Sequence, residues 1–391
     1  MKPSPLPSAF PVVGIVGAGQ LARMTVAPAI ELGIGLRVLA DRADDPAARV
    51  MADVTVGDYR DLATLRSFAA RVDVLTFDHE HVPTGHLQAL EAAGVTVRPG
   101  SAALVHGQDK LVMRRRLASI GVPVPRWASV GSAADIAAFV AAGDDASSDA
   151  VVLKTTRGGY DGKGVRVLRG PADVASAADW LSAGAALIVE ELVDFSRELS
   201  VLVARSPSGQ AVAYPVVESV QVDGVCREVY APAPGLAEPH ALAAQEVALR
   251  IAQDLQLTGL MAVEIFDTAD GVLVNELALR PHNTGHWTIE GSVTSQFEQH
   301  LRAVLDLPLG APTPLAPHAV MVNVLGADLA DLYPAYLHCL ARDPGLKIHV
   351  YGKQVRPGRK VGHVTVVGDD LEDLRERARH AAAYLRGEIQ R

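Results

Sequence analysis

Two glutamates lie on either side of the turn sequence Asp270-Gly271, in segments whose alternation of apolar and polar residues is typical of strands. Glu264 and Glu276 are equally far from position 270, so a hairpin about that turn places them opposite each other, about 5 Å apart. Carboxylates that close repel each other unless one is protonated or a cation lies between them. Mg²⁺ on nucleotide phosphates suits this position, because it takes one or two carboxylates together with phosphate oxygens. The apolar neighbours of both residues disfavour the alternative, a solvated pair at a sheet edge.

A string of polar side chains directly follows the second of these strands. Arg280 can hold a carboxylate or phosphate through two parallel hydrogen bonds, and His282 and Asn283 can donate to the same anion. The segment therefore predicts an anion site beside the carboxylate pair. His286, further along, can equally be structural.

Two glycine-rich loops follow predicted strands. The first, residues 14–19, opens a helix, and Asp41 stands where the acidic residue of a dinucleotide-binding fold contacts a ribose. This pattern leaves an NAD site and a simple tight turn both open. The second loop, residues 157–164, contains Asp161 and Lys163 but no Walker A sequence. It can close over a triphosphate and exclude water, or it can be a flexible connection between strands.

A cluster of cations, Lys353 to Lys360, stands out in an acidic protein. By default such a cluster is a solvated surface patch. Next to a nucleotide site it suits the phosphate of a second substrate.

The elements that must position these groups indicate a mixture of α/β and α+β domains. In residues 1–110, short apolar runs alternate with helical spacing, which predicts a Rossmann-like parallel sheet. Residues 111–310 form a second domain, with a small lid lobe at about 121–193 and a central lobe of longer strands at about 194–310. Residues 311–391 form a small C-terminal domain.

Composition limits the classes of function. The chain has 391 residues, of which 49% are hydrophobic and 21% charged, and its formal net charge of −9 argues against nucleic-acid binding. Cys226 and Cys339 form neither a metal motif nor a disulfide framework, which fits a reducing cytoplasm. Prolines interrupt the longest uncharged stretch, 308–327, and the N-terminus has no apolar signal segment, so neither a membrane span nor export is expected.

Three segments, 154–164, 275–287 and 356–363, together resemble the ATP-grasp superfamily. Within it the chain is most similar, over nearly its whole length, to the ATP-dependent carboxylating enzymes of microbial purine biosynthesis. The strings Gly-Tyr-Asp-Gly-Lys-Gly and His-Asn-x-Gly-His-Trp are specific, whereas the N-terminal glycines are not. The resemblance implies an ATP-grasp fold and a homodimer that uses ATP and Mg²⁺ to carboxylate 5-aminoimidazole ribonucleotide on its 5-amino group. Bicarbonate, activated as carboxyphosphate, would supply the carbon, and neither nucleic acid nor membrane would be a partner.

The resemblance also assigns roles to individual residues. For ATP it implies Lys110, Lys154, Gly159, Gly162, Lys163, Glu190, Glu191, Val193, Glu198 and Asn275. For 5-aminoimidazole ribonucleotide it implies Gln20, Glu80, Tyr160, Asp161, Lys163, Arg359 and Lys360. For Mg²⁺ it implies Glu264 and Glu276, and for catalysis Asp161, Arg280, His282, Asn283 and Lys353.

The chain departs from the family pattern at two places. Leu279 stands where the family usually has proline, a change expected to shift the turn while removing no polar group. The segment 77–81 varies in the family, so Glu80 is preferred to Asp78 as the ribonucleotide contact without a firm motif behind it. The leader, residues 1–11, precedes the resemblance.

Three alternatives stay open. A formate-dependent glycinamide ribonucleotide transformylase shares the nucleotide site, but Tyr160-Asp161 and the string beginning at His282 favour carboxylation. An NAD-dependent oxidoreductase would use Gly17, Gly19 and Asp41 and leaves the carboxylate pair unexplained. A non-catalytic nucleotide-binding protein should have lost some of the charged site residues, and all are present.

Overall fold

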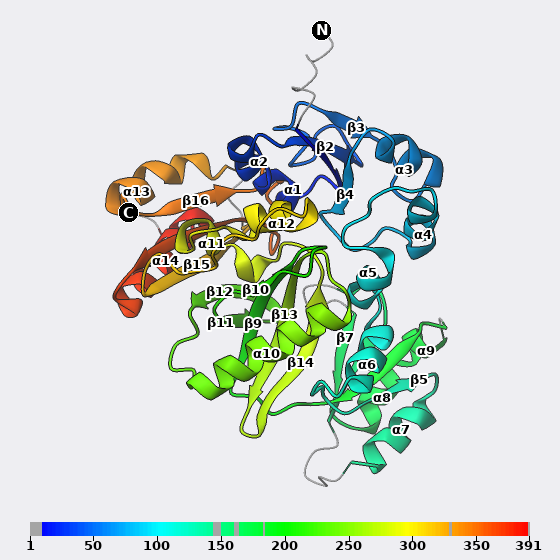
Figure 1. Ribbon diagram of the computed structural model, residues 1–391. Coiled ribbons are helices and arrows are strands. Elements are labelled where there is room, and N and C mark those ends of the chain that lie inside the picture. Colours follow the sequence, from blue (N-terminus) through cyan, green and yellow to red (C-terminus); the bar gives the residue numbers. More distant parts are fainter. Residues whose placement is uncertain (1–9, 144–149, 160–163, 183, 328–330, 390–391) are drawn as a thin grey trace.

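The chain folds into three sheets with helices packed around them (Figure 1). The computed structural model describes residues 10–143, 150–159, 164–182, 184–327 and 331–389. Within this part of the chain, no helix combines the length and the apolar character needed to cross a lipid bilayer.

The N-terminal sheet is parallel, with strand order β3-β2-β1-β4, as the alternating pattern predicted. Adjacent residues of β2 enter different cores, Val38 on one face and Leu39 on the other, because helices cover both faces. The strands are β1 (Val12–Val16), β2 (Gly35–Ala40), β3 (Val54–Val56) and β4 (Val74–Phe77). The helices are α1 (Gln20–Met24), α2 (Val26–Leu32), α3 (Leu62–Ala69), α4 (Thr84–Ala92), α5 (Ser101–Gln108) and α6 (Lys110–Ser119).

A small antiparallel sheet, the lid sheet, follows with strand order β5-β8-β6-β7. Its helices cover an apolar core that includes Ile136, Leu153 and Val189. Residues 157–159 follow β6 and residue 164 precedes β7, so these described parts of the glycine-rich segment lie at one end of this sheet. The elements are β5 (Trp127–Val130), α7 (Ala133–Ala141), β6 (Val151–Thr155), β7 (Val165–Leu168), α8 (Pro171–Ser176), α9 (Ala178–Ser182) and β8 (Leu187–Glu191).

The third sheet has nine strands and spans the predicted central lobe and C-terminal domain. Its order is β14-β13-β9-β11-β12-β15-β17-β16, with β10 paired to β9, so the C-terminal strands extend the central sheet through the β12–β15 pair. The strands are β9 (Arg197–Arg205), β10 (Ala211–Ala213), β11 (Val217–Val222), β12 (Val225–Ala231), β13 (Gly259–Thr268), β14 (Gly271–Ala278), β15 (His318–Leu325), β16 (Lys347–Val350) and β17 (Lys360–Gly368). The helices are α10 (Glu238–Asp254), α11 (Thr288–Gly291), α12 (Gln296–Val304), α13 (Tyr336–Arg342) and α14 (Leu371–Arg386), with 3₁₀ turns at Asn283–Gly285 and Tyr333–Ala335.

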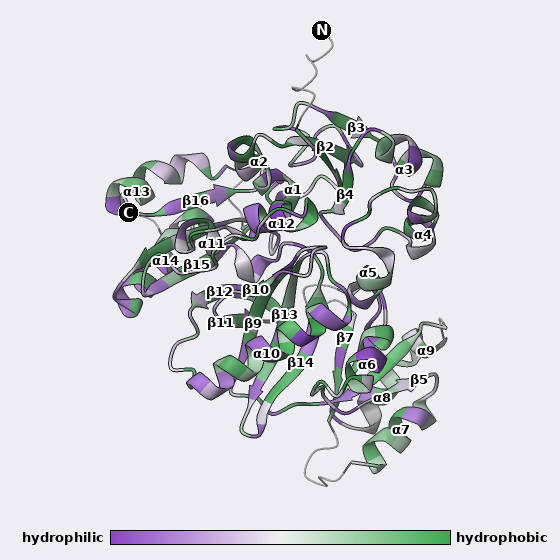
Figure 2. Ribbon diagram, in the orientation of Figure 1, coloured by the Kyte–Doolittle hydropathy of each residue, from purple (hydrophilic) through white to green (hydrophobic). Residues whose placement is uncertain are grey.

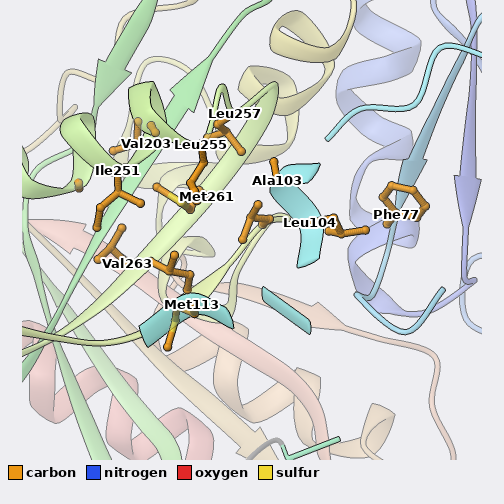
Figure 3. Packing of buried hydrophobic residues seen from close by; sticks show 14 of the residues in the cluster. Phe77, Ala103, Leu104, Met113, Val203, Ile251, Leu255, Leu257, Met261 and Val263 are labelled. Atoms are coloured by element: carbon orange, nitrogen blue, oxygen red, sulfur yellow. The ribbon is translucent and has the colours of Figure 1, made fainter. Parts of the chain in front are cut away.

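Helix α10 shows how sequence spacing creates the core that supports the site. Its buried residues Ala244, Ala248 and Ile251 recur every three to four positions and form one apolar stripe against β9 and β13. Figure 2 shows the same helix carrying both hydrophobic and hydrophilic residues. In Figure 3, Ile251 lies among side chains of the large sheet, and the same cluster continues through α5 and α6 to β4. One core therefore joins the N-terminal sheet to the strands that carry the glutamate pair.

Candidate active site

A cleft of about 1020 Å³ lies where the three sheets meet, and it brings together most of the site residues predicted from the sequence. The predicted residues that line it are Gln20, Glu80, Lys110, Lys154, Gly159, Glu190, Glu191, Val193, Glu198, Glu264, Asn275, Glu276, Arg280, His282, Asn283, Lys353 and Lys360. Arg359 does not line it; this exposed side chain donates instead to the backbone oxygen of Gln354. Tyr160, Asp161, Gly162 and Lys163 lie outside the described residues.

Glu264 and Glu276 are directly opposite each other on β13 and β14, as predicted. The predicted register around the turn is wrong by one residue, however, because Thr268 pairs with Gly271. Continued without interruption, that register would place Asn275 opposite Glu264. The register shifts between Glu264 and Ile265, and this bulge leaves Asn275 as the extra residue and moves Glu276 into the facing position.

The bulge also explains why two consecutive residues of β14 face the cleft. Neighbouring side chains of a regular strand point to opposite faces. Here Asn275 accepts a hydrogen bond from Lys154 Nζ at 3.1 Å, and Glu276 accepts one from Lys110 Nζ at 2.5 Å. Both residues line the cleft. The bulge therefore places three oxygen-bearing side chains that can act as metal ligands, one amide and two carboxylates, next to one another. A regular hairpin would place fewer of them on one face.

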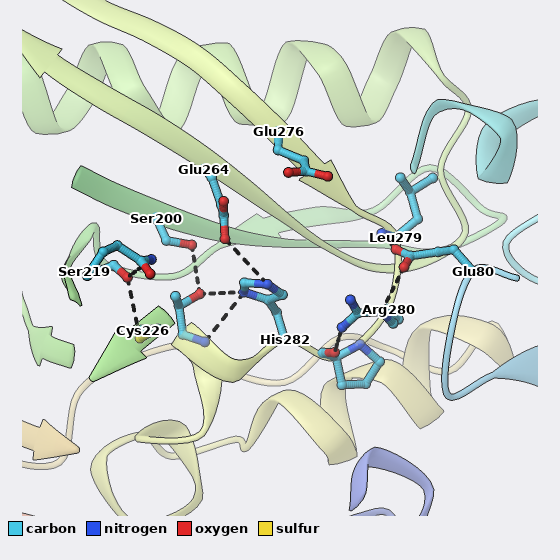
Figure 4. A network of polar contacts seen from close by, with 12 residues as sticks. Glu80, Ser200, Ser219, Cys226, Glu264, Glu276, Leu279, Arg280 and His282 are labelled. Carbon is cyan, nitrogen blue, oxygen red and sulfur yellow. Dashed lines mark hydrogen bonds and ion pairs between the residues drawn. The ribbon is translucent and has the colours of Figure 1, made fainter. Parts of the chain in front are cut away.

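Glu276 is paired with Lys110, whereas the surroundings of Glu264 favour its protonated form. Burial and the neighbouring Glu276 and Glu198 raise the pKa of Glu264 to about 8. His282 Nε2 lies 3.5 Å from Glu264 Oε1, but burial keeps the pKa of that imidazole well below its ordinary value, so it adds no positive charge. Figure 4 shows the two carboxylates on neighbouring strands with His282 below Glu264. Two facing carboxylates, one of which must otherwise be protonated, fit a hard divalent cation such as Mg²⁺.

Lys154 is held at the cleft wall by a buried ion-pair network that the sequence analysis missed. Glu190 lies 2.7 Å from Lys154 Nζ and 2.6 Å from Arg114 Nε, and Arg114 also donates to the carbonyl oxygen of Val274 beside the bulge. Burial alone would raise the pKa of Glu190, but Lys154 and Arg114 outweigh it and hold the pKa below its ordinary value. Burial lowers the pKa of Lys154 in spite of Glu190. Arg114 is one of three consecutive arginines on α6, a pattern that resembles a solvated face.

The N-terminal glycine turn is filled by a carboxylate of the protein itself. Asp78 accepts hydrogen bonds from the backbone N–H groups of Gly19 at 2.9 Å and Ala22 at 2.8 Å. A Cβ at position 19 would lie 2.2 Å from Asp78 Oδ2, so only glycine fits, and Gly17 has φ +94°. The donors that would bind the pyrophosphate of a dinucleotide are therefore already paired, which argues against the NAD alternative.

Glu80 has a different set of partners. It accepts from the backbone N–H of Leu279 at 2.8 Å and from Arg280 Nε at 2.9 Å, while Asp78 is committed to the glycine turn. Burial lowers the pKa of the Arg280 guanidinium, but the Glu80 carboxylate raises it by more, so this pKa lies above its ordinary value. Leu279 removes no polar group, as expected, and it adds one, because its N–H, which proline lacks, holds one oxygen of Glu80.

An aromatic pair also lines the cleft and was missed in the sequence analysis. The rings of Phe195 and Phe266 stack with centroids 4.7 Å apart, beside the end of β8. Together with Val193 they form an apolar wall suited to a flat heteroaromatic ring. Phe195 follows the predicted hinge strand by two residues, a position that could have identified it, whereas Phe266 lies far away in the sequence, on β13.

Comparisons with known proteins match every part of this architecture. Residues 11–108 match the family model of the ribonucleotide synthetase preATP-grasp domain, 115–297 the ATP-grasp domain, and 319–377 the phosphoribosylaminoimidazole carboxylase C-terminal domain. The chain is 55% identical over 383 residues to N5-carboxyaminoimidazole ribonucleotide synthase of Mycobacterium tuberculosis, covering 96% of this chain and 88% of the relative. It is 50% identical over 384 residues to the same enzyme of Corynebacterium ammoniagenes, covering 96% and 92%.

Solved structures agree in fold. A crystal structure of the ADP complex of an N5-carboxyaminoimidazole ribonucleotide synthetase matches with a TM-score of 0.88 and 36% identity, covering 100% of both chains. An Aspergillus clavatus N5-carboxyaminoimidazole synthase in complex with ADP and 5-aminoimidazole ribonucleotide matches with a TM-score of 0.87 and 29% identity, covering 97% of this chain and 99% of that one.

Proposed function

Because this chain belongs to the N5-carboxyaminoimidazole ribonucleotide synthase family of ATP-grasp enzymes, we propose that its cleft couples ATP cleavage to the carboxylation of 5-aminoimidazole ribonucleotide by bicarbonate. The chain is an ATP-dependent ligase of purine biosynthesis, as the resemblance predicted, and its product is N5-carboxyaminoimidazole ribonucleotide. The observation that carries the residue-level proposal is the facing pair Glu264 and Glu276, with Lys110, Lys154 and Asn275 against it, in a cleft that also holds an anion site.

The reaction must first make bicarbonate reactive. Its carbon is a poor electrophile, so a bicarbonate oxygen attacks the γ-phosphorus of ATP, which releases ADP and forms carboxyphosphate. Carboxyphosphate then breaks down to CO₂ and phosphate within the closed site. The 5-amino group attacks the CO₂ carbon and loses one proton, for which the released phosphate is an adequate base.

The nucleotide end of the cleft performs the first step mainly by positioning and charge. Lys110 and Lys154 bind the phosphates, and Glu198 accepts hydrogen bonds from the ribose hydroxyls. The adenine lies against the Phe195–Phe266 wall and bonds to the backbone of residues 190–193. Glu264, Glu276 and the Asn275 oxygen would hold Mg²⁺, which would supply positive charge against the transferring phosphoryl group.

The opposite end of the cleft binds the second substrate and the one-carbon unit. Arg280, with His282, Asn283 and Lys353, binds bicarbonate and then carboxyphosphate. Residues of the loop 157–164, with Gln20 and Glu80, would surround the ribonucleotide, and Lys360, which lines the cleft, would take its 5′-phosphate; Arg359 would have to leave Gln354 to join it. Asp161 orients the amine. Closure of this loop would keep water from carboxyphosphate.

We propose further that the enzyme is a cytoplasmic homodimer. The family resemblance supports the dimer. The free cysteines Cys226 and Cys339, both of which are buried, support a reducing compartment such as the cytoplasm. Light scattering of the purified protein tests the stoichiometry, and a mass of one protomer would refute it.

ADP release tests the reaction. The assay contains ATP, Mg²⁺ and bicarbonate, with and without 5-aminoimidazole ribonucleotide. We expect strong stimulation by the ribonucleotide and transfer of labelled bicarbonate into an acid-labile product. Stimulation by formate and glycinamide ribonucleotide instead would assign the chain to the sister transformylase reaction.

A further inference from the structure

His286 lies at the end of the anion-binding string, and the sequence alone left it as a residue that could be purely structural. Its side chain is 0% exposed, yet it belongs to the residues that line the cleft. It follows Arg280, His282 and Asn283 in the sequence. Arg280, Lys353 and Lys360 all lie close enough to lower its pKa. Each ring nitrogen of a buried imidazole is expected to have a hydrogen-bond partner.

The first nitrogen is fixed by Gln296, whose side chain is also 0% exposed. The backbone N–H of His282 donates to Gln296 Oε1 at 2.8 Å, which identifies that atom as the oxygen of the amide. Gln296 Nε2 must therefore be the donor in its two other contacts, to the carbonyl oxygen of His282 at 2.8 Å and to His286 Nδ1 at 2.9 Å. His286 Nδ1 accepts, so the neutral ring carries its proton on Nε2.

That second nitrogen is buried without a hydrogen-bond partner among the residues that the structure describes. Leaving a buried N–H unpaired costs about 1–3 kcal/mol. The ring is also held in place, since it stacks on His363 with centroids 4.9 Å apart and on Phe297 with centroids 5.8 Å apart. The two ring nitrogens of His286 point in widely different directions. Nδ1 faces Gln296, and Gln296 does not line the cleft, so Nε2 points away from Gln296.

The charge state of the ring suits a donor rather than an acid. Burial first of all, and then His349, Lys360 and Arg280, keep the pKa of His286 well below its ordinary value. A neutral Nε2–H can hydrogen-bond to an oxyanion without transferring its proton. Asn283 Nδ2, which also lines the cleft, is likewise buried, and within the described part of the chain it has no hydrogen-bond partner except the weakly accepting thiol of Cys226.

We propose that His286 is a further catalytic residue, whose Nε2–H, together with Asn283 Nδ2, donates to the carboxylate oxygen of bicarbonate and then of carboxyphosphate. Gln296 is the positioning residue that sets its tautomer. This inference rests on the proposed function and adds to it a neutral pair of donors beside the charged Arg280. The arrangement stabilises the anion while leaving it unprotonated.

Steady-state kinetics of His286→Phe, His286→Gln and Gln296→Glu in CO₂-depleted buffer test the inference. His286→Phe keeps a flat ring between His363 and Phe297 and removes the donor. We expect the KM for bicarbonate to rise at least tenfold, or about 1.4 kcal/mol, with the KM for ATP changed less than twofold. His286→Gln, which retains an N–H donor, should recover part of the loss. Gln296→Glu should resemble His286→Phe, because its carboxylate draws the imidazole proton to Nδ1.

An unchanged KM for bicarbonate in folded His286→Phe, or a rise in the KM for the ribonucleotide alone, would overturn the inference. If His286→Phe does not fold, ¹⁵N NMR of histidine-labelled wild-type enzyme decides instead. The Nε2–H tautomer and a shift of its resonance on saturation with bicarbonate in the presence of ADP support the proposal, and the Nδ1–H tautomer or an unmoved resonance refutes it. Ribonucleotide-stimulated ADP release by wild-type enzyme separates these outcomes from failure of the proposed function.

Discussion

The backbone N–H of Leu279 donates to Oε1 of Glu80 over 2.8 Å, and Nε of the next residue, Arg280, lies 2.9 Å from the other oxygen. One carboxylate from the loop after β4 thus ties the end of β14 to the N-terminal domain. Figure 4 shows Glu80 between Leu279 and Arg280. The contact fixes Arg280 at the boundary between the two domains, where we propose the anion site.

Glu80→Gln should therefore weaken both catalysis and the domain junction. The amide oxygen can still accept from Leu279, but the charge that balances the buried Arg280 is lost. We expect kcat/KM for the ribonucleotide to fall at least tenfold, about 1.4 kcal/mol, and the free energy of unfolding to fall by about 3 kcal/mol. Urea denaturation and steady-state kinetics measure both, with the exposed Glu246→Gln as control. Wild-type values for Glu80→Gln would show that Arg280 is positioned by other groups.

The facing glutamates could be predicted from the sequence, but the way they come to face each other could not. Alternating residues around a turn predict a hairpin, and the prediction of Glu264 opposite Glu276 is confirmed. The bulge at Asn275 has no local sequence signature, because it is set by how β13 and β14 pack against the rest of the sheet. Without it, the turn actually formed would have placed Asn275 opposite Glu264.

The roles of other residues depend on contacts between distant segments. The Asp78 carboxylate reaches Gly19 across 59 positions and Glu80 reaches Leu279 across 199, so nothing near either residue in the sequence announces its partner. The parallel N-terminal sheet, by contrast, follows from local periodicity and was predicted correctly.

Removing one glutamate of the pair should abolish turnover while leaving the fold intact. We expect Glu276→Gln to lower kcat by about a hundredfold or more, because the proposed Mg²⁺ site would lose one of its two carboxylates. In a thermal-shift assay, Mg²⁺ with ATP should raise the Tm of the wild type and leave that of the variant nearly unchanged. Asp270→Asn, at the exposed turn of the same hairpin, is the matched control. Chelation of Mg²⁺ by EDTA should stop the wild-type reaction, and near-normal activity of Glu276→Gln would reject the metal assignment.

Glu198 should give the unliganded enzyme a pH-dependent stability. Burial raises the pKa of this carboxyl to about 7, although Lys154 opposes the shift. A carboxyl whose pKa is higher in the folded than in the unfolded state contributes stability below its unfolded pKa, and that contribution is lost as the pH rises through the folded value. Glu198→Gln removes this loss, so its free energy of unfolding relative to the wild type should increase between about pH 5 and pH 8.

The same variant should bind ATP more weakly, since an amide is a poorer acceptor for the ribose hydroxyls than a carboxylate. We expect the KM for ATP to rise about tenfold at pH 8, or about 1.4 kcal/mol, close to the lower end of what one hydrogen bond to a charged group contributes. Urea titrations at several pH values, run beside Glu246→Gln, measure the stability. A constant difference between variant and wild type across this range would show that Glu198 ionises normally.

Arg114 and Arg115 are consecutive residues of one helix with opposite surroundings, which makes them a matched pair for testing the ion-pair network. Arg114 is 1% exposed and bonds to Glu190 and to the Val274 carbonyl, whereas Arg115 is exposed. Removing one partner of a buried ion pair leaves an uncompensated charge and costs about 3–5 kcal/mol. We expect this loss of unfolding free energy for Arg114→Met and almost none for Arg115→Met.

The effect on catalysis follows from Lys154, the third member of the network. With Arg114 gone, Glu190 has only Lys154 to neutralise it and competes more strongly with the ATP phosphates for that ammonium group. The KM for ATP should therefore rise in Arg114→Met and stay at the wild-type value in Arg115→Met. Adding Glu190→Gln to Arg114→Met removes the unpaired carboxylate and should recover part of the lost stability. Equal stability of the two single variants would mean that the buried network contributes nothing beyond the packing of α6 against the lid sheet.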